Sequence, residues 1–213
     1  MPIYNEALSE YITQHFARED LPLREAREKS PEKGLPAISI QPEEGRFLQV
    51  LVASCRATKA VEIGTLGGYS GIWIARGLVP GGKLYTLEKS EKHKWVAQEH
   101  FAGAGVADRV EIILGDAHQS LKKLAPWGPF DFVFIDADKS SYNAYYDWAI
   151  TNVRVGGIIT AHNMFRNGNV LNPDADEDVA TIDALNRRTA YDPRVISTIF
   201  PAGDGTLVAV RIG

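Results

Sequence analysis

The stretch VEIGTLGGYS, at residues 61–70, decides the fold of this chain. An apolar run carries an acidic residue, then meets a glycine-rich turn, and a helical segment follows. Glycines let the backbone approach a ligand closely at the start of a helix. The turn lacks the second glycine of the dinucleotide fingerprint G-x-G-x-x-G, and it lacks the Gly-Lys-Ser/Thr of a P-loop. The missing motifs argue against a phosphate, and the acidic residue before the turn suits a ligand with a cationic amino-acid portion. The alternative is a plain structural turn.

Short apolar runs alternate with helical segments on both sides of this stretch. The runs lie at 60–63, 83–87, 110–114, 130–135 and 157–161, and the helical segments near 70–78, 91–104, 119–124, 141–152 and 177–190. This alternation predicts βαβ units and an α/β fold with a mostly parallel, doubly wound sheet. The end of the chain differs, because 195–200, the turn 202–205 and 206–212 predict a β-hairpin at the sheet edge.

The first fifty residues read as helices. Apolar residues recur at helical spacing within 8–16, and Pro42 stands at the start of a helix that we expect to reach about residue 56. Between these helices, Pro22 and Pro31 break the charged stretch 18–33.

Length and composition predict one soluble domain, 1–213, with an N-terminal helical segment at 1–57 and a core at 58–213. No apolar run approaches the ~18 residues of a membrane span, and the N-terminus lacks the pattern of a secretory signal. The single cysteine, Cys55, cannot form an intramolecular disulfide. A reducing, cytoplasmic location fits best.

Polar residues follow each expected strand, where ligands bind in open α/β sheets. Glu88 follows the second strand and could accept hydrogen bonds from a ribose diol, or be a surface carboxylate. Asp116, Ala117 and His118 follow the third and suit an adenine edge, although His118 could simply begin the next helix.

Ionisable residues follow the fourth and fifth strands. Asp136, Asp138 and Lys139 come after one, and His162 and Asn163 come after the other. If these strand ends are neighbours, Asp136, His162 and Asn163 converge and offer a carboxylate oxygen, an imidazole nitrogen and an amide oxygen to a metal ion. An exposed, salt-bridged turn and a structural histidine are the alternatives.

Taken in order, these pieces resemble the cation-dependent O-methyltransferases, the family of catechol O-methyltransferase, the plant caffeoyl-CoA O-methyltransferases and small bacterial relatives. The resemblance covers roughly residues 38–213. Its most specific pieces are PEEG at 42–45 with FL at 47–48, VEIG at 61–64, GYS at 68–70, FIDADK at 134–139 with Tyr142, and GDG at 203–205. It implies a Rossmann-like class I methyltransferase fold: a seven-stranded, mostly parallel sheet with a C-terminal antiparallel hairpin, helices on both faces and extra N-terminal helices.

The resemblance also implies S-adenosylmethionine as the methyl donor. The methionine end of this cofactor would be lined by Glu62, Gly64, Thr65 and Ser70. Glu88 would hold the ribose, and Ala117 would meet the adenine with Asp116 and His118 beside it. Asp138 would lie near the cofactor.

For the chemical step, the resemblance makes Asp136 and Asn163 metal ligands and Lys139 the general base. There is one departure: the family usually carries Asp-Asn where this chain has His162-Asn163. Imidazole removes one negative charge and adds a softer nitrogen donor. Mg²⁺ should therefore bind less well, and Mn²⁺, Fe²⁺, Co²⁺, Ni²⁺ or Zn²⁺ become more competitive. A site that needs no metal stays open. Arg166 also stands where the plant enzymes carry an asparagine linked to substrate.

We therefore expect methyl transfer to a hydroxyl of a small catechol-like or phenolic acceptor, assisted by a metal and by Asp136 and Lys139. Lys139 would take the hydroxyl proton or stabilise the anion. The alternatives are methylation of a hydroxyuridine in tRNA and a non-catalytic cofactor-binding protein. A net charge of −4 counts against nucleic acid, although a basic face within 18–33 could serve it. We expect a homodimer, with no nucleic-acid or membrane partner.

Overall fold

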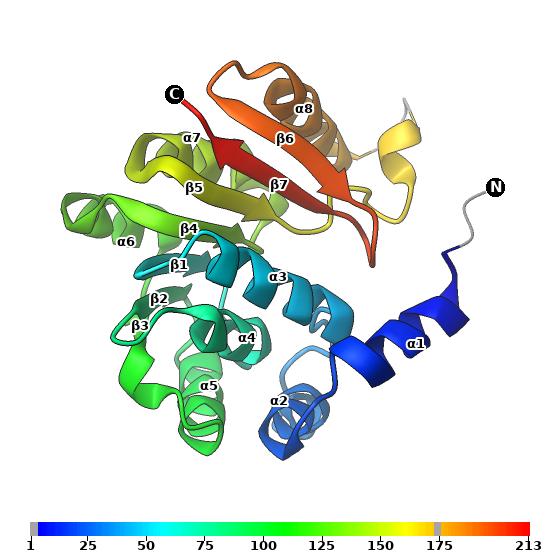
Figure 1. Cartoon of the computed structure of the whole chain (residues 1–213), viewed down its shortest axis with the longest axis vertical. Helices are drawn as coiled ribbons and strands as arrows, with labels where there is room; N and C mark the ends of the chain where they lie inside the picture. The colour runs from blue at the N-terminus through cyan, green and yellow to red at the C-terminus, as the bar shows by residue number, and fades with distance from the viewer. Residues whose placement is uncertain (1–3, 173–175) are drawn as a thin grey trace.

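A seven-stranded sheet in the order β3-β2-β1-β4-β5-β7-β6 forms the centre of the computed structural model, which describes residues 4–172 and 176–213 (Figure 1). Its strands are β1 (Lys59–Ile63), β2 (Lys83–Glu88), β3 (Val110–Leu114), β4 (Phe130–Ile135), β5 (Val153–Ala161), β6 (Val195–Phe200) and β7 (Thr206–Arg211). The first five strands pair in parallel, and β7 pairs antiparallel with both β5 and β6. The predicted α/β class, parallel sheet and C-terminal hairpin are confirmed.

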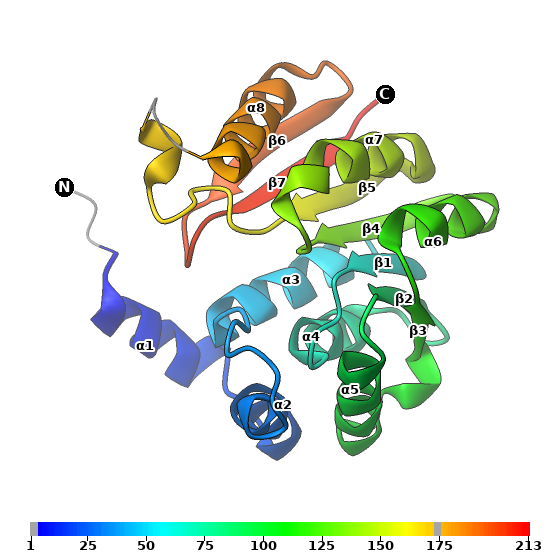
Figure 2. The same ribbon diagram turned by 180° about the vertical axis from the view of Figure 1, so that it is seen from behind.

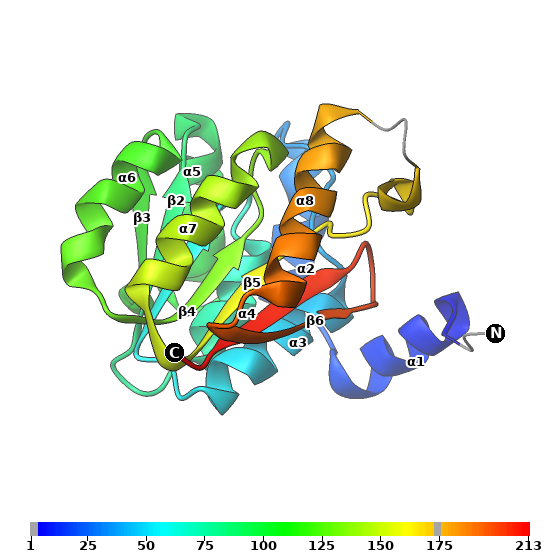
Figure 3. The same ribbon diagram turned by 90° about the horizontal axis from the view of Figure 1, so that it is seen from above.

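Helices cover both faces of the sheet, as predicted (Figures 1 and 2). They are α1 (Glu6–Phe16), α2 (Leu21–Glu32), α3 (Pro42–Ser54), α4 (Tyr69–Gly77), α5 (Glu91–Gly103), α6 (Ala117–Leu124), α7 (Tyr142–Asn152) and α8 (Glu177–Tyr191). Helices α3, α4 and α5 lie on one face, and α6, α7 and α8 lie on the other (Figure 3). Helix α2 packs on α4 and α5, and α1 extends outward from α3. Within the described ranges, we find no helix long and apolar enough to cross a bilayer.

The prediction that prolines break the charged stretch 18–33 is wrong, because α2 runs through it without interruption. Pro22 lies in the first turn of α2, where its missing N–H would have had no helical acceptor. The carboxylate of Asp20 accepts a hydrogen bond from the backbone N–H of Leu23 (3.2 Å) and caps the same turn. Pro31 lies in the last turn, so only one helical hydrogen bond is lost.

Strand β5 begins earlier than the sequence predicts, at Val153 rather than residue 157. Val153 pairs with Phe130, and the ladder resumes at the pair of Phe132 and Ile158, so extra residues of β5 bulge out between them. Gly156 takes the left-handed φ of 77° within this bulge. The apolar alternation restarts only after the bulge, which explains the late predicted start.

Two apolar layers hold the strand ends in place. Phe130, Tyr142 and Tyr146 are fully buried between the sheet and the α6–α8 face, and Trp73 and Phe132 are buried on the other face. Each such side chain contributes about 1.5–3 kcal/mol through burial. The sheet therefore presents its carboxyl ends as a rigid edge.

The carboxylate of Asp131 ties together the opposite edge of the sheet. Its Oδ2 accepts hydrogen bonds from the backbone N–H of Thr58 (2.7 Å) and of Lys59 (2.8 Å). Its Oδ1 accepts one from Nε of Arg154 (2.6 Å) on β5. Burial raises the pKa of Asp131, but these hydrogen bonds outweigh it and hold the pKa below its ordinary value. Asp131 thus fastens β1, β4 and β5 to one another.

We predict that Asp131→Ala lowers the free energy of unfolding by about 3 kcal/mol, because it leaves several donors without an acceptor. The difference in the free energy of unfolding between the wild type and the variant should be largest above pH ~4, the ordinary pKa of an aspartate. It should shrink as the pH falls through the lower pKa that Asp131 has in the folded state. Urea unfolding from pH 7 to pH 3 checks both points. Asp183→Ala, which removes an exposed i,i+4 pair with Arg187, is the control. Equal losses in the two variants would contradict the role of Asp131.

Candidate active site

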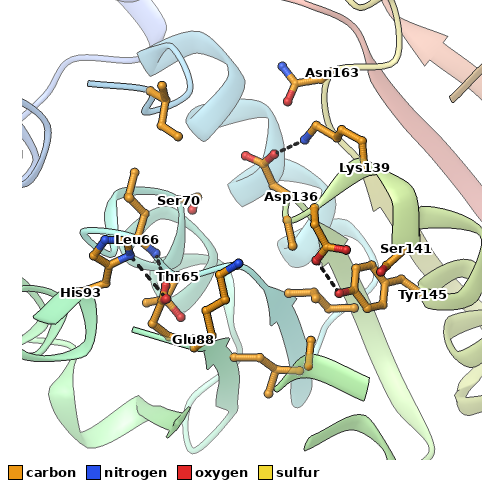
Figure 4. A pocket seen from close by; sticks show the side chains of 18 of the residues that line it. Thr65, Leu66, Ser70, Glu88, His93, Asp136, Lys139, Ser141, Tyr145 and Asn163 are labelled. Carbon is orange, nitrogen blue, oxygen red and sulfur yellow. Dashed lines mark hydrogen bonds and ion pairs between the residues drawn. The ribbon is translucent and has the colours of Figure 1, made fainter. Parts of the chain in front are cut away.

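A cleft of about 850 Å³ opens at the carboxyl ends of the parallel strands (Figure 4). Eleven of the thirteen residues predicted for the site line it: Gly64, Thr65, Ser70, Glu88, Asp116, Ala117, His118, Asp136, Asp138, Lys139 and Asn163. The other two, Glu62 and His162, are buried directly behind the cleft wall. The residues predicted at the strand ends therefore lie in or directly behind one cleft, and their roles stay a prediction.

The glycine-rich turn after β1 lies directly against the end of β4. Gly64 has a φ of 105°, and a Cβ atom at this position would stand 2.1 Å from the carbonyl oxygen of Asp136. Only glycine fits both the conformation and the space. The turn and the residues after β4 consequently form one continuous wall of the cleft.

Glu88 supports this turn from the end of β2. Its Oε2 accepts a hydrogen bond from the backbone N–H of Leu66 (2.9 Å), and its Oε1 accepts one from Ser90 (2.8 Å). His93 Nδ1 lies 3.4 Å from the same Oε1 (Figure 4). Each carboxylate oxygen keeps a further lone pair for a hydroxyl group in the cleft. Glu88 is thus a preorganised acceptor for a diol.

Glu62 is fully buried and reaches the cleft only through a neighbour. Its two oxygens accept hydrogen bonds from the hydroxyl of Ser70, which lines the cleft, and from the hydroxyl of Thr86, each at 2.6 Å. Burial raises the pKa of Glu62 to about 7, although these two hydrogen bonds act in the opposite direction. A cation bound beside Ser70 would draw Glu62 into its ionised form.

The residues after β3 and β4 meet at the far side of the cleft. The carboxylate of Asp138 accepts a hydrogen bond from the hydroxyl of Tyr145 (2.8 Å), as Figure 4 shows. His118 Nε2 lies 3.1 Å from the Ser141 hydroxyl, and its ring centroid lies 5.1 Å from that of Tyr145. These flat and polar side chains form a surface that suits a planar heterocycle with polar edges.

Lys139 and Asp136 form an ion pair at the other end of the cleft (Figure 4). Nζ of Lys139 donates hydrogen bonds to Oδ1 of Asp136 (3.0 Å) and to the hydroxyl oxygen of Tyr142 (2.6 Å). That hydroxyl donates in turn to the backbone carbonyl of His162 (3.2 Å). Burial alone would raise the pKa of Asp136, but His162 and Lys139 lower it to about 2. Asp136 is therefore a carboxylate at neutral pH.

His162 lies between two carboxylates. Its Nε2 is 2.9 Å from Oε1 of Glu44, and its Nδ1 is 3.4 Å from Oδ2 of Asp136. Burial alone would lower the pKa of His162, but Asp136 and Glu44 raise it to about 10. Glu44 is itself buried, and its Oε2 accepts a hydrogen bond from the backbone N–H of Gln41 (2.9 Å) at the start of α3. The two strand ends thus converge as predicted, together with a third element, α3.

Three donor atoms lie where the predicted metal site would be. Asn163 donates from Nδ2 to Oδ2 of Asp204 (3.1 Å), which leaves its amide oxygen free to face the cleft. Nδ1 of His162 is buried and makes no hydrogen bond within the described residues. Metal-binding histidines commonly donate their second ring nitrogen to a carboxylate, as Nε2 does here to Glu44. The donor set of Asp136, His162 and Asn163 fits a divalent ion, although the described residues contain no group of three His, Cys, Asp or Glu that could hold one.

The sequence did not reveal the part played by Glu44. Its place after Pro42 predicts a helix start, and Glu44 does accept the hydrogen bond expected of a capping residue. Its second contact, with His162, spans 118 positions, and nothing local signals it. Ser141 was also missed, because the helix signal around 141–152 gives no reason to place its hydroxyl in the cleft.

Comparisons with known proteins agree with this geometry. Residues 13–212 match the O-methyltransferase family. Catechol O-methyltransferase of Niastella koreensis is 43% identical over 174 residues, which are 81% of this chain and 79% of that protein. Catechol O-methyltransferase of Mycobacterium tuberculosis is 41% identical over 205 residues, or 94% and 93%. The solved O-methyltransferase of Bacillus cereus, in complex with SAH, superposes with a TM-score of 0.90 at 38% identity and covers 96% of this chain and 97% of its own.

These relatives are enzymes, and they match nearly the whole chain, so the alternative of a non-catalytic binding protein is set aside. The chain belongs to the O-methyltransferase family, in the group of S-adenosylmethionine-dependent enzymes that holds the catechol and caffeoyl-CoA O-methyltransferases.

Proposed function

We propose that this enzyme transfers a methyl group from S-adenosylmethionine to a hydroxyl of a small catechol-like acceptor, assisted by a divalent metal ion. The observation that carries the proposal is the pair of Lys139 and Asp136, which lies in the same cleft as the glycine turn at Gly64. An acceptor hydroxyl beside Lys139 would therefore stand close to a methyl group held over that turn.

The cleft suits S-adenosylmethionine along its whole length. Ser70, with Glu62 behind it, would meet the ammonium group. Glu88 would accept hydrogen bonds from the ribose hydroxyls, and His118 and Tyr145 would flank the adenine. When bound, S-adenosylmethionine supplies a methyl group on a sulfonium that is already activated for transfer.

Lys139 is placed to manage the proton of the acceptor hydroxyl. The hydroxyl oxygen forms a bond to the methyl carbon, the carbon–sulfur bond breaks, and its electron pair stays on sulfur. The hydroxyl proton must leave as this happens. Lys139 would accept this proton as a neutral amine, or, as the ammonium paired with Asp136, stabilise the anion once the proton has left. Asp136 and Tyr142 hold the amine in place for either role.

Asp136, His162 and Asn163 would hold the metal ion. When bound, it would orient two vicinal oxygens of the acceptor and acidify one of them. The imidazole nitrogen favours Mn²⁺, Fe²⁺, Co²⁺, Ni²⁺ or Zn²⁺ over Mg²⁺. Glu44, which bonds Nε2 of His162, would keep Nδ1 directed at the ion.

The state of the basic residues in 18–33 supports a small acceptor over tRNA. Arg27 pairs with Glu19 at 2.6 Å, and Lys29 and Lys33 each pair with a glutamate. Because three of the five basic residues of this stretch are paired with glutamates, this face offers less positive charge to a phosphate backbone.

Helix α1 supports the homodimer, which stays a prediction. None of its residues is buried, and Tyr11 and Phe16 are 53% and 63% exposed. Exposed aromatic side chains of this kind suit a contact with a second copy.

We predict that binding of S-adenosylhomocysteine, which keeps the ammonium group, releases about half a proton at pH 7, where Glu62 is half protonated. Affinity should rise between pH 6 and pH 8 as Glu62 ionises more readily. Calorimetry in buffers of different ionisation enthalpy measures the proton release. Glu62→Gln should abolish it and weaken binding. The same proton release in both proteins would remove Glu62 from the binding site.

Lys139→Ala should lower kcat about 100-fold or more at saturating acceptor, the usual size of a general-base effect. Asp136→Ala should also abolish turnover while keeping most of the affinity for the cofactor. Release of S-adenosylhomocysteine from caffeic acid reactions reports both. Lys122→Ala, on the exposed face of α6, is the control. A change in KM alone for Lys139→Ala would argue against its role in the proton step.

His162→Asp should shift the metal preference toward Mg²⁺, and Glu44→Gln should weaken Co²⁺ binding about tenfold or more. Calorimetry on chelator-treated protein measures the affinities, and the visible absorption of Co²⁺ reports its nitrogen ligand independently of turnover. Identical metal profiles in the wild type and His162→Asp would show that His162 is not a ligand. Full activity of the chelator-treated wild type would remove the metal from the proposal and leave the methyl transfer to Lys139.

A further inference from the structure

We propose that Arg166 selects an acceptor that carries a carboxylate, so that the preferred substrate is a catechol acid rather than a neutral catechol. This inference rests on the proposed function and names the substrate class of the same site. Arg166 lines the same cleft as Asp136, Lys139 and Asn163.

The charge of Arg166 is poorly compensated. Among the described residues, its ion pair is with the carboxylate of Asp178, which lies 4.0 Å from Nη2 and is 47% exposed. Its Nε is buried and has no hydrogen-bond partner among the described residues. By contrast, Arg27 and Arg154 contact their carboxylates at 2.6 Å. A buried donor on a cation that faces a cleft is an available anion-binding group.

The other charges at this end leave room for an anion. Lys139 is already paired with Asp136, and Asp138 accepts a hydrogen bond from Tyr145, so neither carboxylate forms the ion pair with Arg166, which lies 4.0 Å from the half-exposed Asp178. The positive charge of Arg166 acts on Tyr142, whose hydroxyl oxygen accepts a hydrogen bond from Lys139. Burial and Asp136 raise the pKa of Tyr142, and Arg166 lowers it. An acceptor held beside Lys139 is therefore also within the field of Arg166.

The backbone fixes Arg166 in place. Arg166 has the left-handed φ of 50°, which is uncommon for a residue with a side chain. Asp204 clamps the turn on both sides of it: its backbone carbonyl accepts from Phe165 N–H (2.9 Å), and its Oδ1 accepts from Asn167 N–H (2.6 Å). Conformations of this kind persist where the surroundings hold them, and they gather at ligand sites. The turn therefore fixes the point from which the side chain extends, and a guanidinium can bind a planar carboxylate through two parallel hydrogen bonds.

The test compares two acceptors with the same ring, 3,4-dihydroxybenzoic acid and its methyl ester. We expect the wild type to prefer the acid. Arg166→Gln should raise KM for the acid tenfold to about 100-fold, the loss expected for charge-assisted hydrogen bonds, and leave the ester within about twofold. Arg166→Lys keeps the positive charge but lacks the two parallel N–H donors of arginine, so its KM for the acid should lie between those of the wild type and Arg166→Gln. Arg187→Gln, which is exposed on α8, is the control.

Calorimetric binding of the acid to the complex of enzyme and S-adenosylhomocysteine tests the same point without turnover. Weaker binding of the acid to Arg166→Gln, with the ester unaffected, supports the proposal. Equal affinities of the wild type for acid and ester overturn it, as do equal losses for both acceptors in the variant. Methylation of both acceptors without preference would reject the role of Arg166 and leave the proposed function intact, whereas a carboxylate preference in binding with no methylation of either would reject the function alone.

Discussion

The contact between Gly64 and the carbonyl oxygen of Asp136 is the constraint on which the rest of the site depends. Because position 64 has no side chain, the turn after β1 lies against the end of β4. The backbone of the turn lines the end of the cleft that is proposed for the cofactor. Asp136 forms the ion pair with Lys139 at the end that is proposed for the acceptor. A Cβ at position 64 would push the two strand ends apart and separate the group to be transferred from the residues that handle the proton.

Buried acids then organise the charges around this contact. Glu62 and Glu88 support the turn, and Glu44 and Asp136 enclose His162. Each is held by donors from a different element, so no single strand or helix carries the site. The cost of burying several carboxylates is offset by these hydrogen bonds and by the cations Lys139 and His162. This explains why Glu62, which has no cation beside it in the chain, is the acid with the raised pKa.

Features that depend on local pattern were predictable from the sequence, and features that depend on long-range contacts were not. The apolar runs located all seven strands, and the strand ends located eleven cleft residues, because the carboxyl ends of parallel strands share one edge. Helix α2 was misjudged because a helix tolerates proline in its first turn, where Pro22 lies, and loses only one hydrogen bond to a proline in its last turn, where Pro31 lies. The start of β5 was misjudged because a bulge interrupts its alternation. The contact of Glu44 with His162 joins α3 to β5 and leaves no periodic trace.

That contact also changes how the histidine should be understood. Taken alone, His162 in place of an aspartate looks like the loss of a ligand and of a negative charge. In the structure, Glu44 supplies a carboxylate on the far side of the ring, so the pair of Glu44 and His162 would carry a negative charge once a metal ion displaced the proton from Nδ1. Gly203 is needed for this arrangement, since a Cβ there would lie 2.3 Å from the Glu44 carboxylate. The turn at residues 203–205 therefore has two structural roles. Gly203 leaves space for Glu44, the partner of His162, and Asp204 holds Asn163 and the turn that carries Arg166.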